Sequence, residues 1–113
     1  MNKTLGLFAG VVTLALTSTS GWAADNTAAL ELAKKSGCLA CHSVDKKVVG
    51  PAWKDVSAKY KGNAEMKAKL VDKVKKGGKG VWGEVPMPPY SPRVADADID
   101  TLVTFVLSLA DQK

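Results

Sequence analysis

The stretch Cys38-Leu39-Ala40-Cys41-His42 decides the interpretation of this 113-residue sequence. The chain has only two cysteines and one histidine, and all three fall within these five positions. A C-x-x-C-H run is the signature of covalent haem attachment. Residues three apart on a helical turn lie on one side, so both thiols can reach the edge of one flat macrocycle. His42 can then bind the iron beneath the ring, and the stretch predicts one covalently attached haem c.

Three other interpretations of the two cysteines stay open at this point, although each is weaker. A thioredoxin-like redox pair would need a strand-rich fold around it. A disulfide between Cys38 and Cys41 would close a very short loop and contribute little stability. A zinc site prefers four nitrogen or sulfur ligands, and this motif supplies three.

The second axial ligand of the iron must come from a small set, because the chain has no second histidine. Met1 falls in the segment predicted below to be removed. Met66 fits the apolar face of a helix, where methionine usually serves as core. Met87 lies in the run 85–89, Val-Pro-Met-Pro-Pro, whose prolines hold it in place. We therefore predict His42 and Met87 as the two axial ligands, which leaves no open iron position and favours electron transfer over catalysis on a substrate.

Other residues are candidates for supporting the haem. The carbonyl of Pro51 is the candidate acceptor for the second ring N–H of His42, since a ligating histidine usually donates that proton to an acceptor. Trp82 has one N–H donor that could bind a haem propionate, or it could be a core aromatic. Lys73 and Lys79 are further propionate candidates, with a solvated lysine as the alternative.

The spacing of apolar residues predicts four helices and no strand. The first three lie at about residues 26–36, 52–60 and 64–76, and the fourth begins in the acidic run 96–100. Residues 77–92 contain four glycines and four prolines, which predicts a stiff, irregular and functional loop. The first helix is expected to pack against the fourth. The apolar face of the fourth helix consists of Ile99, Leu102, Val103, Val106 and Leu109.

Residues 1–24 read as a secretory signal peptide. Lys3 gives a positive start, residues 5–16 are apolar, and small residues precede a cut after Ala23 or Ala24. A membrane anchor is the alternative, but the apolar run is shorter than the roughly 20 residues that a spanning helix needs. Removal leaves a single domain, residues 25–113, whose core is small enough that a cofactor is expected to fill it.

The chain is basic, with 16 lysine and arginine residues against 11 acidic ones. This charge is explained largely by solubility, and it could also steer the protein towards acidic partners. There is only one arginine, Arg93, and basic and aromatic residues do not alternate. Nucleic acid is therefore not expected as a partner.

Four motifs in this order resemble the small bacterial class I cytochromes c of the short periplasmic type. They are residues 38–42, Val-Gly-Pro at 49–51, Gly-Val-Trp-Gly at 80–83 and Pro-Met-Pro-Pro at 86–89. The resemblance covers nearly the whole chain from Asp25. It implies an all-α fold of about four helices wrapped around one haem c.

The same resemblance implies roles for individual residues and for the protein. Pro51 would support His42, while Trp82 and the basic residue Lys73 would contact a propionate. It implies a periplasmic electron carrier, expected as a monomer, between a membrane quinol-oxidising complex and a terminal oxidase or nitrite reductase. Several relatives carry asparagine after Pro-Met-Pro-Pro, where this chain has Tyr90, so the surroundings of Met87 depart from the family pattern.

Overall fold

The computed structural model describes residues 6, 9–13, 15 and 22–111. Most of the predicted signal segment, residues 1–24, therefore lies outside the described residues. Within the described part of the chain, no helix is both long and apolar enough to cross a membrane.

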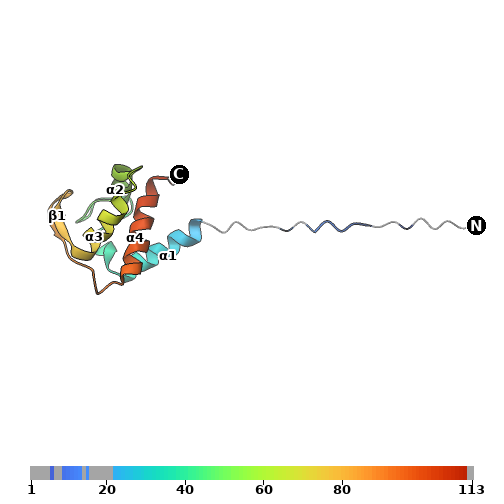
Figure 1. The fold of residues 1–113 in the computed structure, drawn as a ribbon, viewed down its shortest axis with the longest axis horizontal. Coiled ribbons are helices and arrows are strands. Elements are labelled where there is room, and N and C mark those ends of the chain that lie inside the picture. Colours follow the sequence, from blue (N-terminus) through green and yellow to red (C-terminus); the bar gives the residue numbers. More distant parts are fainter. Residues whose placement is uncertain (1–5, 7–8, 14, 16–21, 112–113) are drawn as a thin grey trace, which may run out of the picture.

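The described chain is mostly helical, with one small hairpin (Figure 1). In Figure 1 the hairpin lies on the far side of α2, α3 and α4 from α1. The elements in chain order are α1 (Trp22–Lys35), the 3₁₀ turn η1 (Cys38–Ala40), α2 (Trp53–Tyr60), α3 (Met66–Lys76), β1 (Gly78–Gly80), β2 (Gly83–Met87), α4 (Asp96–Ser108) and the 3₁₀ turn η2 (Leu109–Asp111).

The four predicted helices are present, and their ends follow the helix dipole. Lysines occupy the last turn of α3, and Asp96 and Asp98 occupy the first turn of α4, where each charge faces the opposite partial charge of the helix. The predicted start of the first helix, at about residue 26, was wrong, because α1 begins at Trp22. Ala23 and Ala24 follow Trp22, and alanine has the highest helix propensity, so the helix extends towards the N-terminus beyond the predicted start.

The prediction of no strand was also wrong, because β1 and β2 form an antiparallel pair within the predicted irregular loop. Gly80 pairs with Gly83, which leaves Val81 and Trp82 as the turn. Gly78, Gly80 and Gly83 have φ near +120°, a conformation that glycine adopts without steric cost. Pro86 is tolerated in β2 because both strands of a two-stranded sheet are edges.

The core consists of two clusters on either side of α4. In the first, Ala29 and Ala33 of α1 pack with Trp53 and with Leu102 and Phe105 of α4, so the predicted contact between the first and fourth helices is confirmed. In the second, Ile99 and Val103 of α4 pack with residues that follow the hairpin. Phe105 was missed as a core residue, because it falls beside the apolar stripe recognised in the sequence.

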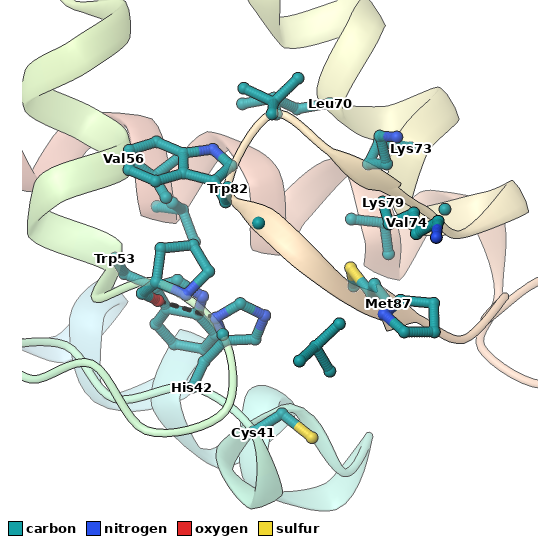
Figure 2. A pocket seen from close by; sticks show the side chains of 18 of the residues that line it. Cys41, His42, Trp53, Val56, Leu70, Lys73, Val74, Lys79, Trp82 and Met87 are labelled. Carbon is teal, nitrogen blue, oxygen red and sulfur yellow. Dashed lines mark hydrogen bonds between the residues drawn. The ribbon is translucent and has the colours of Figure 1, made fainter.

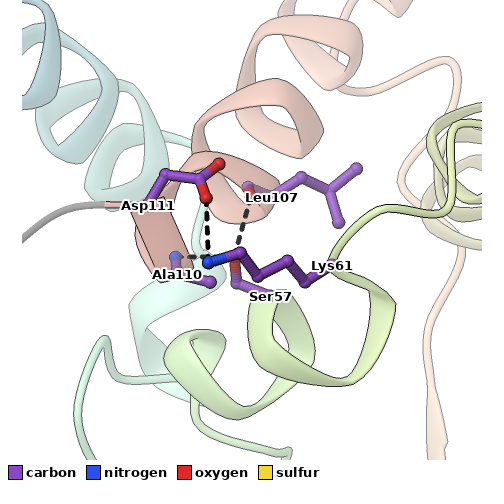
Figure 3. A network of polar contacts seen from close by, with 5 residues as sticks. All are labelled: Ser57, Lys61, Leu107, Ala110 and Asp111. Carbon is purple, nitrogen blue, oxygen red and sulfur yellow. Dashed lines mark hydrogen bonds and ion pairs between the residues drawn. The ribbon is translucent and has the colours of Figure 1, made fainter.

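A buried serine joins α2 to the end of α4 (Figure 3). Ser57 is fully buried, and its hydroxyl donates to the carbonyl of Leu107 at 2.7 Å and accepts from the N–H of Ala110 at 2.8 Å. The last carbonyls of a helix have no partner within the helix, so this hydroxyl satisfies one of them. Lys61 and Asp111 form an ion pair at 3.3 Å beside it, and together these contacts fix the C-terminal turn against α2.

Replacing Ile99 by alanine is expected to destabilise the protein by about 2–5 kcal/mol, because Ile99 is fully buried between α3 and α4 and its loss leaves a cavity. Denaturant unfolding followed by circular dichroism measures the change. Thr104→Ala, on the exposed side of the same helix, is the control and should stay within about 0.5 kcal/mol of the unmodified protein. Equal stability of both variants would contradict the packing described here.

Candidate haem-binding site

One cavity of about 450 Å³ opens between α2, α3, the hairpin and the segment that carries the cysteines. Its volume lies in the range of ligand pockets in proteins, about 300–1,000 Å³. Figure 2 shows His42 and Met87 on different walls of this cavity, one from the loop after η1 and the other from β2. All seven site residues predicted from the sequence line it: Cys38, Cys41, His42, Pro51, Lys73, Trp82 and Met87.

The two cysteines lie on a tight turn at one edge of the cavity. Gly37 adopts φ +84° and ends α1, after which the chain enters the 3₁₀ turn η1. The backbone N–H groups of Cys41 and His42 both donate to the carbonyl of Cys38, at 3.2 and 3.0 Å. This turn fixes the backbone of the two cysteines and of His42 relative to one another.

Both cysteines are free thiols and partly buried. Burial raises the pKa of the Cys38 thiol, and a backbone hydrogen bond and the charge of Arg93 offset part of the rise. Within the described residues, no three His, Cys, Asp or Glu side chains gather as they would around a metal such as zinc.

The imidazole of His42 is fixed by a hydrogen bond. Its Nδ1 lies 2.9 Å from the carbonyl oxygen of Pro51, and because a carbonyl can only accept, Nδ1 carries the proton. The other nitrogen, Nε2, then has a free lone pair for a metal. The ring of Trp53 stacks on the imidazole with centroids 5.7 Å apart, which restrains its tilt.

Gly50 lies directly against the imidazole, a contact that the sequence analysis missed. A Cβ atom at this position would lie 2.5 Å from Cε1 of His42 and 2.9 Å from Nδ1. Only glycine therefore leaves space for the ring in its observed orientation. The one signal in the sequence was a glycine immediately before Pro51.

Replacing Gly50 by alanine is expected to displace the imidazole, weaken its bond to Pro51 and destabilise the protein by about 1–3 kcal/mol, as overpacking does. Denaturant unfolding and the optical spectrum of the haem-loaded protein measure both effects. Val48→Ala changes a neighbouring exposed residue outside the cavity and should leave both unchanged. A native spectrum and stability for the Gly50 variant would show that the ring does not depend on this contact.

Met87 ends β2 and is partly buried. It packs against a cluster that includes Tyr90, Val94 and Ile99. The assignment of Met66 to the core was wrong, since Met66 starts α3, is partly exposed and lines the same cavity. Prolines flank Met87 only, so its thioether has the more restricted backbone of the two.

Trp82 lies at the tip of the hairpin and is 38 % exposed, so it is not a core aromatic. Its ring meets that of Tyr60 edge-on, with centroids 6.4 Å apart, and Lys59 Nζ lies 5.3 Å from the Trp82 centroid. The roles of Tyr60 and Lys59 were not predicted from the sequence, because the contact joins the end of α2 to a distant turn. These contacts connect the end of α2 to the hairpin, and Tyr60 and Trp82 both line the cavity.

The lysines of the cavity wall differ in their partners. Lys79 forms an ion pair with Glu84 at 3.2 Å, which competes with any role at the cavity. Lys73 has no acidic partner among the described residues, and it lies on the side of α3 that lines the cavity. Lys73 is therefore the better placed of the two to meet an anionic group.

A mostly apolar cavity, edged by two thiols and walled by an imidazole and a thioether, defines a helical protein of the haem-binding class. A family model described as Cytochrome c matches residues 27–110. The chain belongs to the cytochrome c family, and its relatives are small class I monohaem members that transfer electrons and are not enzymes.

Two relatives illustrate the match. Cytochrome c-551 of Allochromatium vinosum is 58 % identical over 80 residues, which cover 71 % of this chain and 84 % of the relative. Cytochrome c-551 of Pseudomonas aeruginosa is 43 % identical over 106 residues, or 94 % of this chain and 97 % of the relative. The crystal structure of cytochrome c552 of Nitrosomonas europaea superposes with a TM-score of 0.67 at 49 % identity, covering 71 % of this chain and 98 % of the other.

Cytochromes c bind one covalently attached haem c, and the residues present fit that group. The donor set of the cavity is two thiols, one imidazole nitrogen and thioether sulfur, which suits iron in a thioether-linked porphyrin. Gly50 leaves the space that a properly oriented imidazole needs. The membership of this family also sets aside the thioredoxin-like interpretation of the two cysteines.

Proposed function

We propose that this chain is a soluble periplasmic carrier that transfers one electron at a time through a single haem c with histidine and methionine ligands. The observation that carries the proposal is that one cavity brings together both thiols of the attachment motif, the imidazole of His42 and, on a different wall, the thioether of Met87. These residues come from two segments more than 40 positions apart in the sequence, so their convergence is a property of the fold.

In this proposal, Cys38 and Cys41 form the two thioether links, and Nε2 of His42 and the sulfur of Met87 bind the iron. The hydrogen bond to Pro51 keeps the proton on Nδ1, so that Nε2 stays available as a ligand. The two propionates would be met by Trp82 and by Lys73.

The haem supplies reversible one-electron chemistry, and the residues around it hold its ligands still. The Pro51 carbonyl and the Trp53 ring restrain the imidazole, and the prolines beside Met87 restrain the thioether. A soft thioether favours the ferrous state and raises the reduction potential. Two fixed ligands leave little to rearrange when the electron count changes, which suits a carrier.

The location and partners form the second part of the proposal. Residues 1–24 would direct export and be cleaved, leaving residues 25–113 as a monomeric domain in the periplasm. The donor would be a membrane quinol-oxidising complex and the acceptor a terminal oxidase or nitrite reductase. Redox encounters use small, transient interfaces, and the net positive charge would steer this chain to acidic partner surfaces.

The optical spectra of the oxidised and reduced protein test the ligand assignment directly. We expect a low-spin haem c that resists acid–acetone extraction, with a weak far-red band in the oxidised form from sulfur bound to iron. Carbon monoxide should not bind the reduced protein at neutral pH. Rapid binding of carbon monoxide would instead indicate an open iron position, and the carrier function would be wrong.

The partners are tested by electron-transfer kinetics with purified candidate oxidases and reductases at increasing salt. Electrostatic steering predicts rates that fall as ionic strength rises, because the Debye length shortens to about 8 Å at physiological salt. The mass of the exported protein separately tests the predicted cut after Ala23 or Ala24.

A further inference from the structure

The segment that follows Met87 caps the C-terminal end of α3. The last four carbonyls of a helix have no partner within the helix. Here the N–H of Tyr90 donates to the carbonyl of Val74 at 3.1 Å, and the N–H of Ser91 donates to the carbonyl of Lys75 at 3.3 Å. The methionine segment is therefore joined by its backbone to the last turn of α3.

Two further contacts fix the same segment. Met87 itself pairs with Gly78 in the hairpin, immediately beyond the end of α3. On the other side, Asp96 accepts a hydrogen bond from Ser91 at 3.2 Å and forms an ion pair with Lys75 at 3.1 Å. The segment from Met87 to Ser91 is thus attached to α3 and β1 at both of its ends.

Gly77 lies at the centre of this arrangement, between the last residue of α3 and β1. Its φ of +73° is one that side chains other than glycine adopt at a cost. A Cβ atom at Gly77 would collide with the carbonyl oxygen of Met87, and it would lie 2.9 Å from the backbone carbon of Pro88 and from the nitrogen of Pro89. All three neighbours are backbone atoms, two of them in prolines, so none can rotate away as a flexible side chain would.

We propose that Gly77 is a positioning residue for the Met87 thioether. Because Gly77 has no side chain, the backbone of residues 87–89 can lie directly against the end of α3, and this placement directs the sulfur of Met87 into the cavity. This inference rests on the proposed role of Met87 as an iron ligand. Gly77 is the counterpart, on the methionine side, of Gly50 on the histidine side, since each leaves the space that one axial ligand segment occupies.

The test compares the haem-loaded Gly77→Ala and Gly62→Ala variants. Gly62 also has a positive φ, +79°, and a Cβ there would meet nothing within 4 Å, so this control places alanine at a positive φ without the collision. For Gly77→Ala we expect a weakened far-red sulfur band, a lower reduction potential and at least tenfold tighter binding of imidazole to the oxidised iron. Gly62→Ala should match the unmodified protein in all three.

Two results would overturn the inference: native behaviour of Gly77→Ala, or equal changes in both glycine variants, which would point to backbone strain alone. Met87→Ala separates this failure from that of the proposed function. If Met87→Ala keeps the sulfur band, the ligand assignment itself is wrong and the inference fails with it. If Met87→Ala loses the band and Gly77→Ala keeps it, only the role of Gly77 is wrong.

A second measurement on the unmodified protein applies if Gly77→Ala does not fold. Excess imidazole should displace Met87 and release its segment from α3. The amides of Tyr90 and Ser91 should then exchange with solvent at least tenfold faster, while helical amides of α4 away from the cavity, such as that of Phe105, keep their rates. Unchanged exchange at Tyr90 and Ser91 would show that the thioether and the end of α3 are not coupled, and the inference would be overturned.

Discussion

Replacing Met87 by alanine is expected to lower the reduction potential on the order of 0.1 V and to open the iron to external ligands. Axial ligands set haem potentials over a range of about 0.8 V, and loss of a thioether removes the ligand that favours the ferrous state. The far-red sulfur band should disappear, and carbon monoxide should bind the reduced variant. Redox titration and optical spectroscopy measure these changes.

Met66→Ala is the matched control for this experiment. Met66 lines the same cavity, is also partly exposed, and starts α3 without the prolines that restrain Met87. Its replacement should preserve the sulfur band and the potential. If instead the Met66 variant lost the band and the Met87 variant kept it, the two thioethers would exchange roles and the rigidity argument for Met87 would be wrong.

Replacing Cys38 and Cys41 together by alanine is expected to abolish covalent haem attachment and to leave the chain largely unfolded. Without the haem, the mostly apolar wall of this cavity would face water, and exposed apolar surface costs about 25 cal/mol per Å². A small domain has only about 5–15 kcal/mol of stability from which to meet that cost. Acid–acetone extraction and far-ultraviolet circular dichroism measure the two losses.

Leu39→Ala is the control for the double cysteine variant. Leu39 lies between the two cysteines, is exposed and does not line the cavity, so its replacement should leave haem content and helicity nearly unchanged. A colourless but fully helical double variant would contradict the argument that the haem fills the core. A coloured, extraction-resistant double variant would contradict the proposed attachment through Cys38 and Cys41.

Much of the fold could be predicted because its signals are local. The apolar stripe on α4, the acidic first turn of that helix and the lysines that end α3 each lie within a few residues of one another. The same holds for the attachment motif, whose spacing alone places two thiols and an imidazole on one turn. The ends of the helices were predicted less accurately, since α1 begins at Trp22 and not at about residue 26.

Predictions failed where neighbouring residues carry no periodic signal. The hairpin of residues 78–87 contains glycines and a proline, which indicate a turn but not the pairing of Gly78 with Met87. Met66 fits the helical apolar stripe of α3, yet its side chain lines the cavity, whereas Leu70 and Val74 of the same stripe also pack against the core. Helical spacing identifies an apolar face without saying what covers it.

The four helices, the attachment motif and the short set of residues from which iron ligands can come follow from the sequence, because each depends on spacings of a few positions along the chain. The folded chain alone shows that Gly50 lies against His42, that Gly77 lies against the Met87 segment and that Tyr60 meets Trp82. These contacts join segments whose distance in space does not follow from their separation in sequence. A glycine that permits close approach of another segment leaves no pattern in the sequence, because it has no side chain. Its role can be recognised only when the position of the neighbouring segment is known.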